Sequence, residues 1–426
     1  MNNLPAEVAA YLKKYEFKPY QVITNKNKLY KNIIVIPVLN ELENIKKLLP
    51  SLLNGKIKPV DDNLILFVIN NSVNEDNYEN RQIIAYLDEE QKEEINFNFA
   101  YIDACTNDNA LPEKDAGVGL ARKIGMDTAL KYFDYDTSNK NLLICLDADC
   151  VVSDNYLEEI ITQFNKNNYH AGCVNYAHQF DKEQHIEAII NYEIFLRYYV
   201  LGLKYAKSPY AFNTIGSTMV CDVNAYIKVE GMNKRKAAED FYFMEKLGKH
   251  YKIHLLNDAY VYPSSRESYR VPFGTGRSMT NYTHHPEIMH KLYDSEVFDV
   301  LHKWNKLFNN EDFYDAKYYL EQSSAVNVYL YNFLVEQKLI DSYSKISLNS
   351  KDGKQLHKQK IRWFDGFRTL KFVHYFRDNA QHNINMFDAL DKLFNLFNVN
   401  SGIKRYKDIP DVETQKEYMN ILRTLT

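Results

Sequence analysis

Short apolar runs alternate with helix-spaced segments along residues 1–260 of this 426-residue chain. Three runs, at 32–37, 64–69 and 142–146, are almost wholly apolar, which is typical of strands buried on both faces of a parallel sheet. Helical spacing follows at 42–53, 117–132 and 156–164, and shorter strand-like runs occur at 97–102, 217–221 and 253–256. Strands that alternate with helices predict βαβ units. We therefore expect an α/β fold built on a parallel sheet.

The pattern changes near residue 295. Segments at 297–308, 316–337 and 386–397 carry helical spacing and many aromatic residues, whereas the polar stretch 345–360 predicts a linker or long loop. A chain of 426 residues is too long for one ordinary core. We predict a first domain over residues 1–295 and a mostly helical C-terminal region over 296–426.

Composition and charge are those of an ordinary soluble protein, with 45% hydrophobic residues and a net charge of -4 that gives no indication of nucleic-acid binding. The five cysteines form no metal-binding spacing, and the N-terminus lacks the apolar core of a signal peptide. The most apolar long segment, 186–203, contains Glu187, Glu193 and Arg197, so it predicts an amphipathic helix and not a membrane span. We expect a cytoplasmic protein, with peripheral contact at a membrane left open.

Two carboxylates one residue apart, Asp147 and Asp149, follow the apolar run 142–146. In open α/β sheets, ligands bind beyond the carboxyl ends of the strands. A strand-end Asp-x-Asp therefore places two oxygen ligands where they suit a divalent cation that carries phosphate. The alternative is a simple turn, because aspartate favours turns. The spacing alone does not decide between the two interpretations.

Four further segments carry candidate chemistry. Residues 37–41 and 70–72 follow other strands of the predicted sheet, so they face the same edge as the two aspartates. Residues 117–122 place Arg122 in a glycine-bearing loop and early helix, which suits a diphosphate or base but is equally typical of a tight turn. Glu239 and Asp240 precede a helical run. They could be acidic residues that favour a helix start, or they could supply a general base.

Together these segments resemble the family 2 glycosyltransferases, nucleotide-sugar enzymes with the GT-A fold. The sequence IIVIPVLNE (33–41) is similar to the family's opening strand and P-x-Y-N-E turn, and GVGLARKIG (117–125) to its G-x-x-x-A-R-N-x-G segment. LICLDADCVVSDNYLEEI (143–160) is similar to the D-x-D strand with its following helix, and GSTMVCDVNAYIKVEGMNKRKAAEDFYF (216–243) to the segment that leads into the E-D motif. The resemblance covers roughly residues 30–265 and implies a GT-A glycosyltransferase domain, Rossmann-like, within residues 1–295.

The resemblance also implies a role for each matching residue. Asp149, helped by Asp147, would hold Mn²⁺ or Mg²⁺ against the diphosphate of a nucleotide-sugar donor. Asp240 would deprotonate an acceptor hydroxyl on a carbohydrate, a lipid-linked molecule or a small molecule, and Glu239 would support it. The other residues expected to bind the nucleotide sugar are Pro37, Val38, Glu41, Asn70, Asn71, Arg122, Asp147, Arg266 and Arg270.

Two departures from the family pattern bear on specificity. Where the family often has Asp-Asp after its second strand, this chain has Asn70 and Asn71, which leaves the donor base open. The Gln-x-x-Arg-Trp motif of some relatives is absent, and residues 264–277 carry three arginines around a Gly-Thr-Gly turn. Those arginines suit a loop that clamps a diphosphate or an anionic acceptor; the alternative is a solvated basic loop. His284 and His285 are the nearest histidines that could supply a further metal ligand. The alternative is that they have a structural role or are simply exposed.

Several alternatives stay open. We favour inverting transfer, because the Glu-Asp motif offers a base and no separate nucleophile is evident, but the same segments also suit a retaining enzyme. Residues 146–151 also fit the first motif of haloacid-dehalogenase-type phosphatases, in which Asp147 would be the nucleophile and Asp149 the general acid. No clear later motif of that class follows in the sequence. A non-catalytic glycan- or nucleotide-binding scaffold would predict loss of the base or the metal pair.

The C-terminal stretch 358–377 mixes aromatic and basic residues. This mixture suits contact with an anionic membrane surface or a lipid-linked acceptor. The interpretation we favour is that its aromatics pack on the catalytic domain and its charges remain solvated.

Overall fold

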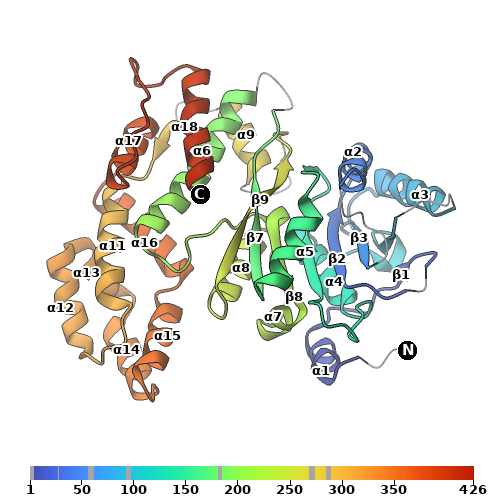
Figure 1. Ribbon diagram of the computed structural model, residues 1–426, viewed down its shortest axis with the longest axis horizontal. Coiled ribbons are helices and arrows are strands. Elements are labelled where there is room, and N and C mark those ends of the chain that lie inside the picture. Colours follow the sequence, from blue (N-terminus) through green and yellow to red (C-terminus); the bar gives the residue numbers. More distant parts are fainter. Residues whose placement is uncertain are drawn as a thin grey trace. The chain divides into compact units, whose positions relative to one another are not determined.

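The computed structural model describes residues 4–26, 28–55, 62–92, 97–180, 185–267, 274–284 and 289–426. The chain forms two compact units (Figure 1), each described here by itself. Unit 1 comprises Met1–Asp181 and Thr214–Gly274, and unit 2 comprises Lys182–Asn213 and Thr275–Thr426. We expected a single boundary at residue 295. In the structure, residues 182–213 and 275–295 instead group with the C-terminal helices.

Unit 1 is built on a nine-stranded sheet with the order β1-β4-β3-β2-β5-β8-β7-β9-β6 (Figure 1). The strands are β1 (Val22–Ile23), β2 (Asn32–Val38), β3 (Asn63–Asn70), β4 (Phe99–Ala104), β5 (Leu142–Cys145), β6 (Cys150–Val152), β7 (Ala171–Tyr176), β8 (Met219–Asp222) and β9 (Ile253–Pro263). β2 lies parallel to both β3 and β5, and β3 lies parallel to β4. The carboxyl ends of these four strands therefore meet at one edge. The expected α/β sheet is confirmed, with β8 antiparallel to its neighbours β5 and β7.

Helices cover the sheet because its strands are apolar on both faces. Every residue of β2 and β3 is buried, as the continuous apolar runs predict. The helices that follow these strands are α2 (Leu42–Leu53), α3 (Tyr78–Lys92), α4 (Val118–Ala129) and α5 (Tyr156–Lys166). Helix α4 is buried along nearly its whole length. Its Gly125 allows close packing, since a Cβ there would lie 2.4 Å from Val35 and 2.7 Å from Val68.

Helix α4 is also fixed from its other side. Tyr11 of α1 (Ala6–Tyr15) and Tyr226 of α7 (Val223–Lys228) donate hydrogen bonds of 2.8 Å and 2.6 Å to Asp127 of α4. Lys123 forms an ion pair of 2.8 Å with the other oxygen of the same carboxylate. These bonds satisfy a carboxylate that is almost wholly buried, which is the condition for keeping one inside a core.

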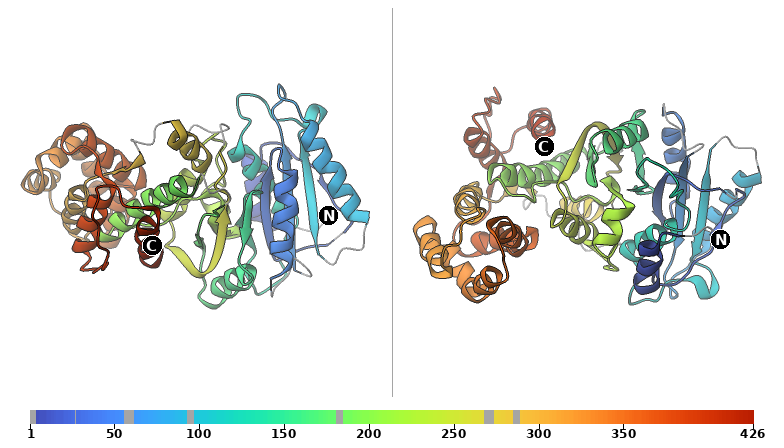
Figure 2. Two further views of the ribbon diagram at one scale, coloured as in Figure 1. Left: turned by 90° about the horizontal axis from the view of Figure 1, so that it is seen from above. Right: turned by 60° about the horizontal axis from the view of Figure 1, so that its bottom comes forward.

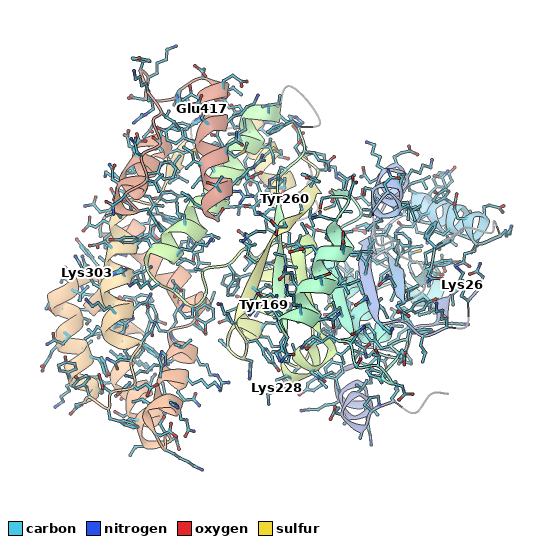
Figure 3. The ribbon with its side chains drawn as sticks, viewed as in Figure 1. Lys26, Tyr169, Lys228, Tyr260, Lys303 and Glu417 are labelled. Carbon is cyan, nitrogen blue, oxygen red and sulfur yellow. The ribbon has the colours of Figure 1, made fainter. Side chains whose placement is uncertain are left out.

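β9 lies near the end of the sheet opposite β1, next to the edge strand β6. It lies parallel to β7 and antiparallel to β6, with Pro263 opposite Cys150. Near the start of β9, His254 stacks on Tyr169, with ring centroids 3.6 Å apart; Tyr169 and Tyr260 are labelled in Figure 3. The pairing of β6 with β9 brings the segment after Pro263 next to the residues that follow β5.

Unit 2 is a helical body, as expected for the C-terminal region (Figures 1 and 2). Its helices include α6 (Ile186–Tyr205), α9 (Thr275–His284), α11 (Glu296–Phe308), α12 (Ala316–Val326), α13 (Val328–Glu336), α14 (Leu339–Leu348), α15 (Gly353–Trp363), α16 (Gly366–Asn379), α17 (Met386–Leu396) and α18 (Val412–Leu425). A short antiparallel pair joins β10 (Lys291–Leu292) to β11 (Ile384–Asn385). One core of aliphatic and aromatic side chains runs from α6 through α11 to α18.

Helix α6 differs from the amphipathic helix we predicted. Residues around its whole circumference are buried, including both charged side chains of its middle turns. Arg197 donates to Glu193 across 2.8 Å, and Arg423 of α18 donates to the same carboxylate across 2.6 Å and 3.0 Å. The prediction was wrong because these charges neutralise one another inside the unit, so they do not mark a solvated face.

Two predictions about the C-terminal region also need correction. Residues 345–360 are not a linker; most of them lie in α14 and α15, which bury Tyr343, Leu356 and Trp363 in the core of unit 2. The aromatics of 358–377 are buried, as in the interpretation we favoured, but Trp363, Phe364, Phe372 and Phe376 pack within the helical core of unit 2 itself. Polar surface residues hid these buried positions in the sequence.

In the part of the chain that the structure describes, every helix is too short or too polar to cross a bilayer.

Candidate active site

The ends of β2 and β3 are tied together by amides. Asn70 donates from Nδ2 to the carbonyl of Val38 across 2.8 Å, and Asn80 of α3 donates to the carbonyl of Asn70 across 2.9 Å. The backbone N–H of Asn40 donates to Asn80 Oδ1 across 2.8 Å, and Asn40 itself has a left-handed φ of 53°. Asn80 thus fixes the turn after β2. Sequence analysis missed this residue, since nothing in its local pattern marks it.

Asn71 presents one polar atom without a partner. Its Nδ2 donates to the carbonyls of Glu75 and Ser72 across 2.9 Å and 3.1 Å. Its Oδ1 is buried and has no hydrogen-bond partner among the residues that the structure describes. A buried acceptor of this kind is costly unless a ligand or water satisfies it. Asn71 can therefore accept a hydrogen bond from a ligand N–H, whereas the Asn70 amide group is used within the fold.

Arg122 lies at the centre of the site. Its guanidinium, which is 3% exposed, forms ion pairs with Asp147 after β5 and with Glu239 of α8 (Glu239–Gly248). Burial lowers the pKa of Arg122, but the two carboxylates more than offset this effect and hold it above its usual range. One arginine thus joins the first turn of α4, the D-x-D segment and the E-D segment, which are far apart in sequence.

Two glycines make room for this contact. A Cβ on Gly119 of α4 would lie 2.2 Å from the carbonyl oxygen of Arg235 and 2.9 Å from Cβ of Glu239. A Cβ on Gly216 would lie 2.3 Å from the guanidinium of Arg122. The glycines of the 117–125 segment therefore act through close approach of α4 to its neighbours, and not through a tight turn. Gly216 was missed as a site residue, although it opens the 216–243 segment of the resemblance.

Asp240 begins α8 beside Glu239. The preceding residue, Ala238, has a left-handed φ of 57°, a conformation that costs a non-glycine residue free energy and is concentrated at functional sites. Burial and the neighbouring Glu239 carboxylate raise the pKa of Asp240 to about 7. Its Oδ1 also accepts from its neighbour's N–H, that of Phe241, across 2.7 Å. A carboxylate with a pKa near neutrality is suited to exchange protons.

Asp149 is held by a second arginine. Arg266, three residues beyond β9, places Nε 3.2 Å and its terminal nitrogen 3.1 Å from Asp149 Oδ2, and it also pairs with Glu41. Burial raises the pKa of Asp149 to about 6, although Arg266 opposes the shift. Glu41 is buried at the start of α2, where it also accepts from Asn44 across 2.5 Å. The D-x-D segment is thus clamped between two arginines.

The predicted site residues fall into three groups. Glu41, Arg122, Asp147, Asp149, Glu239, Asp240 and Arg266 are linked by the contacts above. Pro37 and Val38 are the last two residues of β2 and are buried within the sheet, so their side chains belong to the core. Arg270 and His285 lie outside the described residues, and His284 ends α9 in unit 2.

The charge of the cluster suits a divalent cation. Five carboxylates, Glu41, Asp147, Asp149, Glu239 and Asp240, surround two guanidiniums, Arg122 and Arg266. Carboxylate oxygens are the ligands that Mg²⁺ and Mn²⁺ prefer. Among the described residues no group of three or more acidic, histidine or cysteine side chains is arranged to hold a metal. A cation at this site would take carboxylate oxygens from the protein and leave room in its shell for phosphate oxygens.

Residues 111–231 match the model of the family described as "Glycosyl transferase family 2". Over these residues the chain matches the family 2 glycosyltransferases. The matched segment contains Arg122, Asp147, Asp149 and Gly216 and ends before Glu239, which the structure connects to it through Arg122. The GT-A fold expected from the resemblance is confirmed by this match and by the mixed sheet.

The chain is also similar to solved glycosyltransferase structures. S. aureus TarS 1-349 in complex with UDP-GlcNAc is 13% identical, with a TM-score of 0.41 over 93% of this chain and 90% of that one. The mannosyltransferase PcManGT from Pyrobaculum calidifontis in complex with GDP-Man and Mn²⁺ is 12% identical, with a TM-score of 0.39 over 88% of this chain and 95% of that one. At these values neither likeness supports a conclusion by itself. No curated protein sequence matches the chain.

The phosphatase alternative loses its support. In this glycosyltransferase Asp147, the nucleophile of that hypothesis, is paired with the buried guanidinium of Arg122. A carboxylate held in an ion pair is a poor nucleophile, because attack must break the pair. Both carboxylates of the D-x-D segment and the E-D pair are present, so the feature whose loss would indicate a scaffold is not lost.

Proposed function

We propose that this glycosyltransferase moves a sugar from a nucleotide-sugar donor to an acceptor hydroxyl by a metal-dependent, inverting displacement. The observation that carries the proposal is the arrangement around Arg122, which joins the D-x-D carboxylate Asp147 to Glu239, the neighbour of Asp240. A metal-binding pair and a base are needed within one site for this reaction. The acceptor class, whether carbohydrate, lipid-linked or small molecule, is left to experiment.

Asp240 is the proposed base. Its pKa, raised to about 7 by burial and by Glu239, lets it take a proton from a hydroxyl that becomes acidic as the glycosidic bond forms. Glu239 cannot share this role easily, since its carboxylate is committed to Arg122. We assign Glu239 to holding Arg122 in place. We assign inversion because Asp240 offers one base and no separate nucleophile is evident at the site among the residues that the structure describes.

Asp149 and Asp147 are the proposed ligands of Mn²⁺ or Mg²⁺. When bound, the cation would offset the negative charge that grows on the departing nucleoside diphosphate. Arg122 keeps Asp147 oriented from the core side, and Arg266 lies on the more exposed side of Asp149. The clamp on the D-x-D segment thus holds both carboxylates at the strand ends, where a diphosphate is expected.

Asn71 is the proposed reader of the donor base. Its Oδ1 is a buried acceptor without a partner among the described residues, so it can accept from the imino N–H of uracil, thymine or guanine. Cytosine has no imino N–H and could donate to this acceptor only through its exocyclic amino group. We therefore expect a uridine, thymidine or guanosine donor in preference to a cytidine one.

The test is thermal stabilisation by UDP, GDP, CDP and dTDP, each with and without Mn²⁺. A ligand at 100 times its dissociation constant adds about 2.7 kcal/mol to the free energy of unfolding, which is easily measured. We expect one nucleotide to stabilise the protein strongly only with Mn²⁺, and Asp149→Asn to lose this response.

The matched control is Asp154→Asn, which makes the same change on an exposed side chain five residues further along the chain, after β6. It should keep the full response. Stabilisation by a nucleotide that is independent of Mn²⁺ and of Asp149 would contradict the metal assignment. The configuration of the product's anomeric carbon, read by NMR, separates inversion from retention.

A further inference from the structure

Arg266 occupies one of the two carboxylate oxygens that Asp149 could offer a metal ion. Its guanidinium approaches Asp149 Oδ2 through two nitrogens, at 3.2 Å and 3.1 Å, and one of these nitrogens also pairs with Glu41. An oxygen that accepts two charge-assisted hydrogen bonds has little capacity left for a metal bond of about 2.1 Å. A cation that binds Oδ2, alone or together with Oδ1, therefore competes with the guanidinium for Asp149.

The position of Arg266 is set by the backbone. Pro263 at the end of β9 lies opposite Cys150 of β6, and Cys150 follows Asp149 directly. The N–H of Arg266 donates to Ser264 Oγ across 3.3 Å, which holds the chain close after the strand ends. The register of β6 and β9 thus brings the segment that carries Arg266 next to Asp149.

The two arginines of the site differ in how easily they can move. The side chain of Arg122 is 3% exposed and is surrounded by α4, α8 and the D-x-D segment. The side chain of Arg266 is 33% exposed, and that of its partner Asp149 is 27% exposed. A partly solvated guanidinium can exchange partners at low cost, whereas a buried one cannot leave its carboxylates without a large penalty. Arg122 is a fixed counter-ion, and Arg266 is an exchangeable one.

We propose that Arg266 is a built-in competitor of the divalent cation: it neutralises Asp149 and Glu41 in the free enzyme and releases Asp149 when donor and metal bind together. The inference rests on the proposed function, because it assumes that Asp149 is a metal ligand. The donor's diphosphate gives the displaced guanidinium a new anionic partner, which suits its bidentate geometry. Metal alone must break the Arg266–Asp149 pair without such compensation. Metal and nucleotide therefore bind cooperatively, and Arg266 is the residue that couples them.

The test measures Mn²⁺ binding by the EPR signal of the free ion, with the wild type and Arg266→Gln, each with and without UDP or GDP. Without nucleotide, Arg266→Gln should bind Mn²⁺ about tenfold more tightly, because the competitor is gone; couplings of this kind span roughly 5- to 150-fold. With Mn²⁺ present, the same variant should bind the nucleotide about tenfold more weakly. The nucleotide-dependent gain in Mn²⁺ affinity should shrink accordingly.

Two variants serve as controls. Arg81→Gln removes one positive charge from an exposed position on α3 and should leave both affinities unchanged. Arg266→Lys keeps the charge but cannot bridge two carboxylates with a planar fork, so its Mn²⁺ affinity should lie between those of the wild type and Arg266→Gln.

The possible outcomes distinguish a failure of the competitor role of Arg266 from a failure of the proposed metal site. Equal Mn²⁺ affinity of the wild type and Arg266→Gln, with a normal response to nucleotide, would overturn the competitor role and leave the proposed metal site intact. No Mn²⁺ binding by either protein, even with UDP or GDP, would overturn the metal site and the inference with it. Weaker Mn²⁺ binding by Arg266→Gln would show that the arginine assists the metal, which also contradicts the proposal.

Discussion

The two units each bury an ionic cluster, and the two clusters are built differently. In unit 2, the single carboxylate of Glu193 accepts from two guanidiniums, those of Arg197 and Arg423. In unit 1, five carboxylates surround two guanidiniums, and burial raises the pKa of Asp149 and Asp240. The cluster of unit 2 has its acid fully neutralised, whereas that of unit 1 has acid in excess.

The difference separates a structural ion pair from a functional one. A buried carboxylate with matched partners contributes to a defined fold and has no remaining demand for a cation. A surplus of carboxylates is unfavourable for the folded state alone, and it becomes favourable when a cation or a proton is supplied. Removing an acid should therefore harm unit 2 through stability and unit 1 through activity.

The largest effect is expected for Asp240→Asn. Loss of a general base typically lowers the rate by 10²–10⁴-fold, and we expect about 10³-fold in kcat. Nucleotide binding should persist, since the change lies outside the proposed diphosphate ligands. Initial rates with a donor of the nucleotide that stabilises the protein, together with nucleotide-induced shifts in melting temperature, measure both quantities. Asp258→Asn, on an exposed residue of β9, is the matched control.

The ionisation of Asp240 should make stability and activity depend on pH in opposite directions. Its pKa is raised from 3.8 to about 7, so the folded protein holds this proton more tightly than the unfolded chain does. This contribution to stability is fully present below about pH 4 and is lost as pH rises through 7. Activity should follow the opposite course, falling about tenfold per pH unit below 7, because the base must be ionised. Asp240→Asn should remove the part of both trends that is centred near pH 7 and leave that of Asp149 near pH 6; an unchanged acidic limb in its pH–rate profile would contradict the assignment.

The next effect is expected for Glu193→Gln in unit 2. Removing this carboxylate leaves two arginines in the core without their counter-charge, which should cost about 3 kcal/mol and lower the melting temperature by roughly 6–12 °C. Glu413→Gln, on an exposed residue of α18 paired with Lys416, should cost less than about 0.5 kcal/mol. Thermal unfolding followed by circular dichroism measures both. A neutral Glu193→Gln would mean that the buried pair contributes no net stability.

A smaller effect is expected for Gly216→Ala. The new Cβ would lie 2.3 Å from the Arg122 guanidinium, which must then shift away from Asp147 or Glu239. We expect kcat/KM to fall about tenfold, or 1.4 kcal/mol, with little change in melting temperature. Gly172→Ala crowds a backbone oxygen of His254 at 2.8 Å, away from Arg122, and should show the reverse pattern. Equal losses of stability in the two variants would refute a specific role for Gly216.

The smallest effect concerns another buried cation, Lys360 of α15. Its ammonium donates to the carbonyls of Asn310 and Asp312 across 3.2 Å and 3.0 Å, and to Tyr319 across 2.6 Å. Burial lowers its pKa to about 8, so the unfolded chain holds this proton more tightly than the folded one. The wild type should gain about 1 kcal/mol of stability over Lys360→Met between pH 7 and pH 9. Lys358→Met, on an exposed side chain, should show no such divergence.

Much of unit 1 could be predicted from the sequence because local pattern and tertiary environment agree there. The apolar runs around β2, β3 and β5 are buried on both faces, as their composition requires. The D-x-D and E-D segments were found because, taken with two other segments, they resemble family 2 glycosyltransferase motifs. Their connection through Arg122 was not predictable, since it depends on a packing of α4 that only the folded chain defines.

Unit 2 was harder to predict for the opposite reason. Glu193 and Arg197 indicated a solvated face, yet their partner Arg423 lies more than 200 residues away in sequence. The polar stretch 345–360 concealed a helix whose buried positions include a lysine. Polar residues that pair over long distances give no local signal, so pattern-based prediction assigns them to the surface.

The insertion of α6 decides how the catalytic unit could be isolated. A chain cut after Gly274 would keep α6 and lose the helices that cover Ile190, Ile194, Tyr198 and Leu201, each at most 1% exposed in the intact protein. That fragment would display a bare apolar helix and would tend to aggregate. A minimal catalytic fragment therefore needs two cuts and one join, with residues 182–213 replaced by a short polar linker between Asp181 and Thr214.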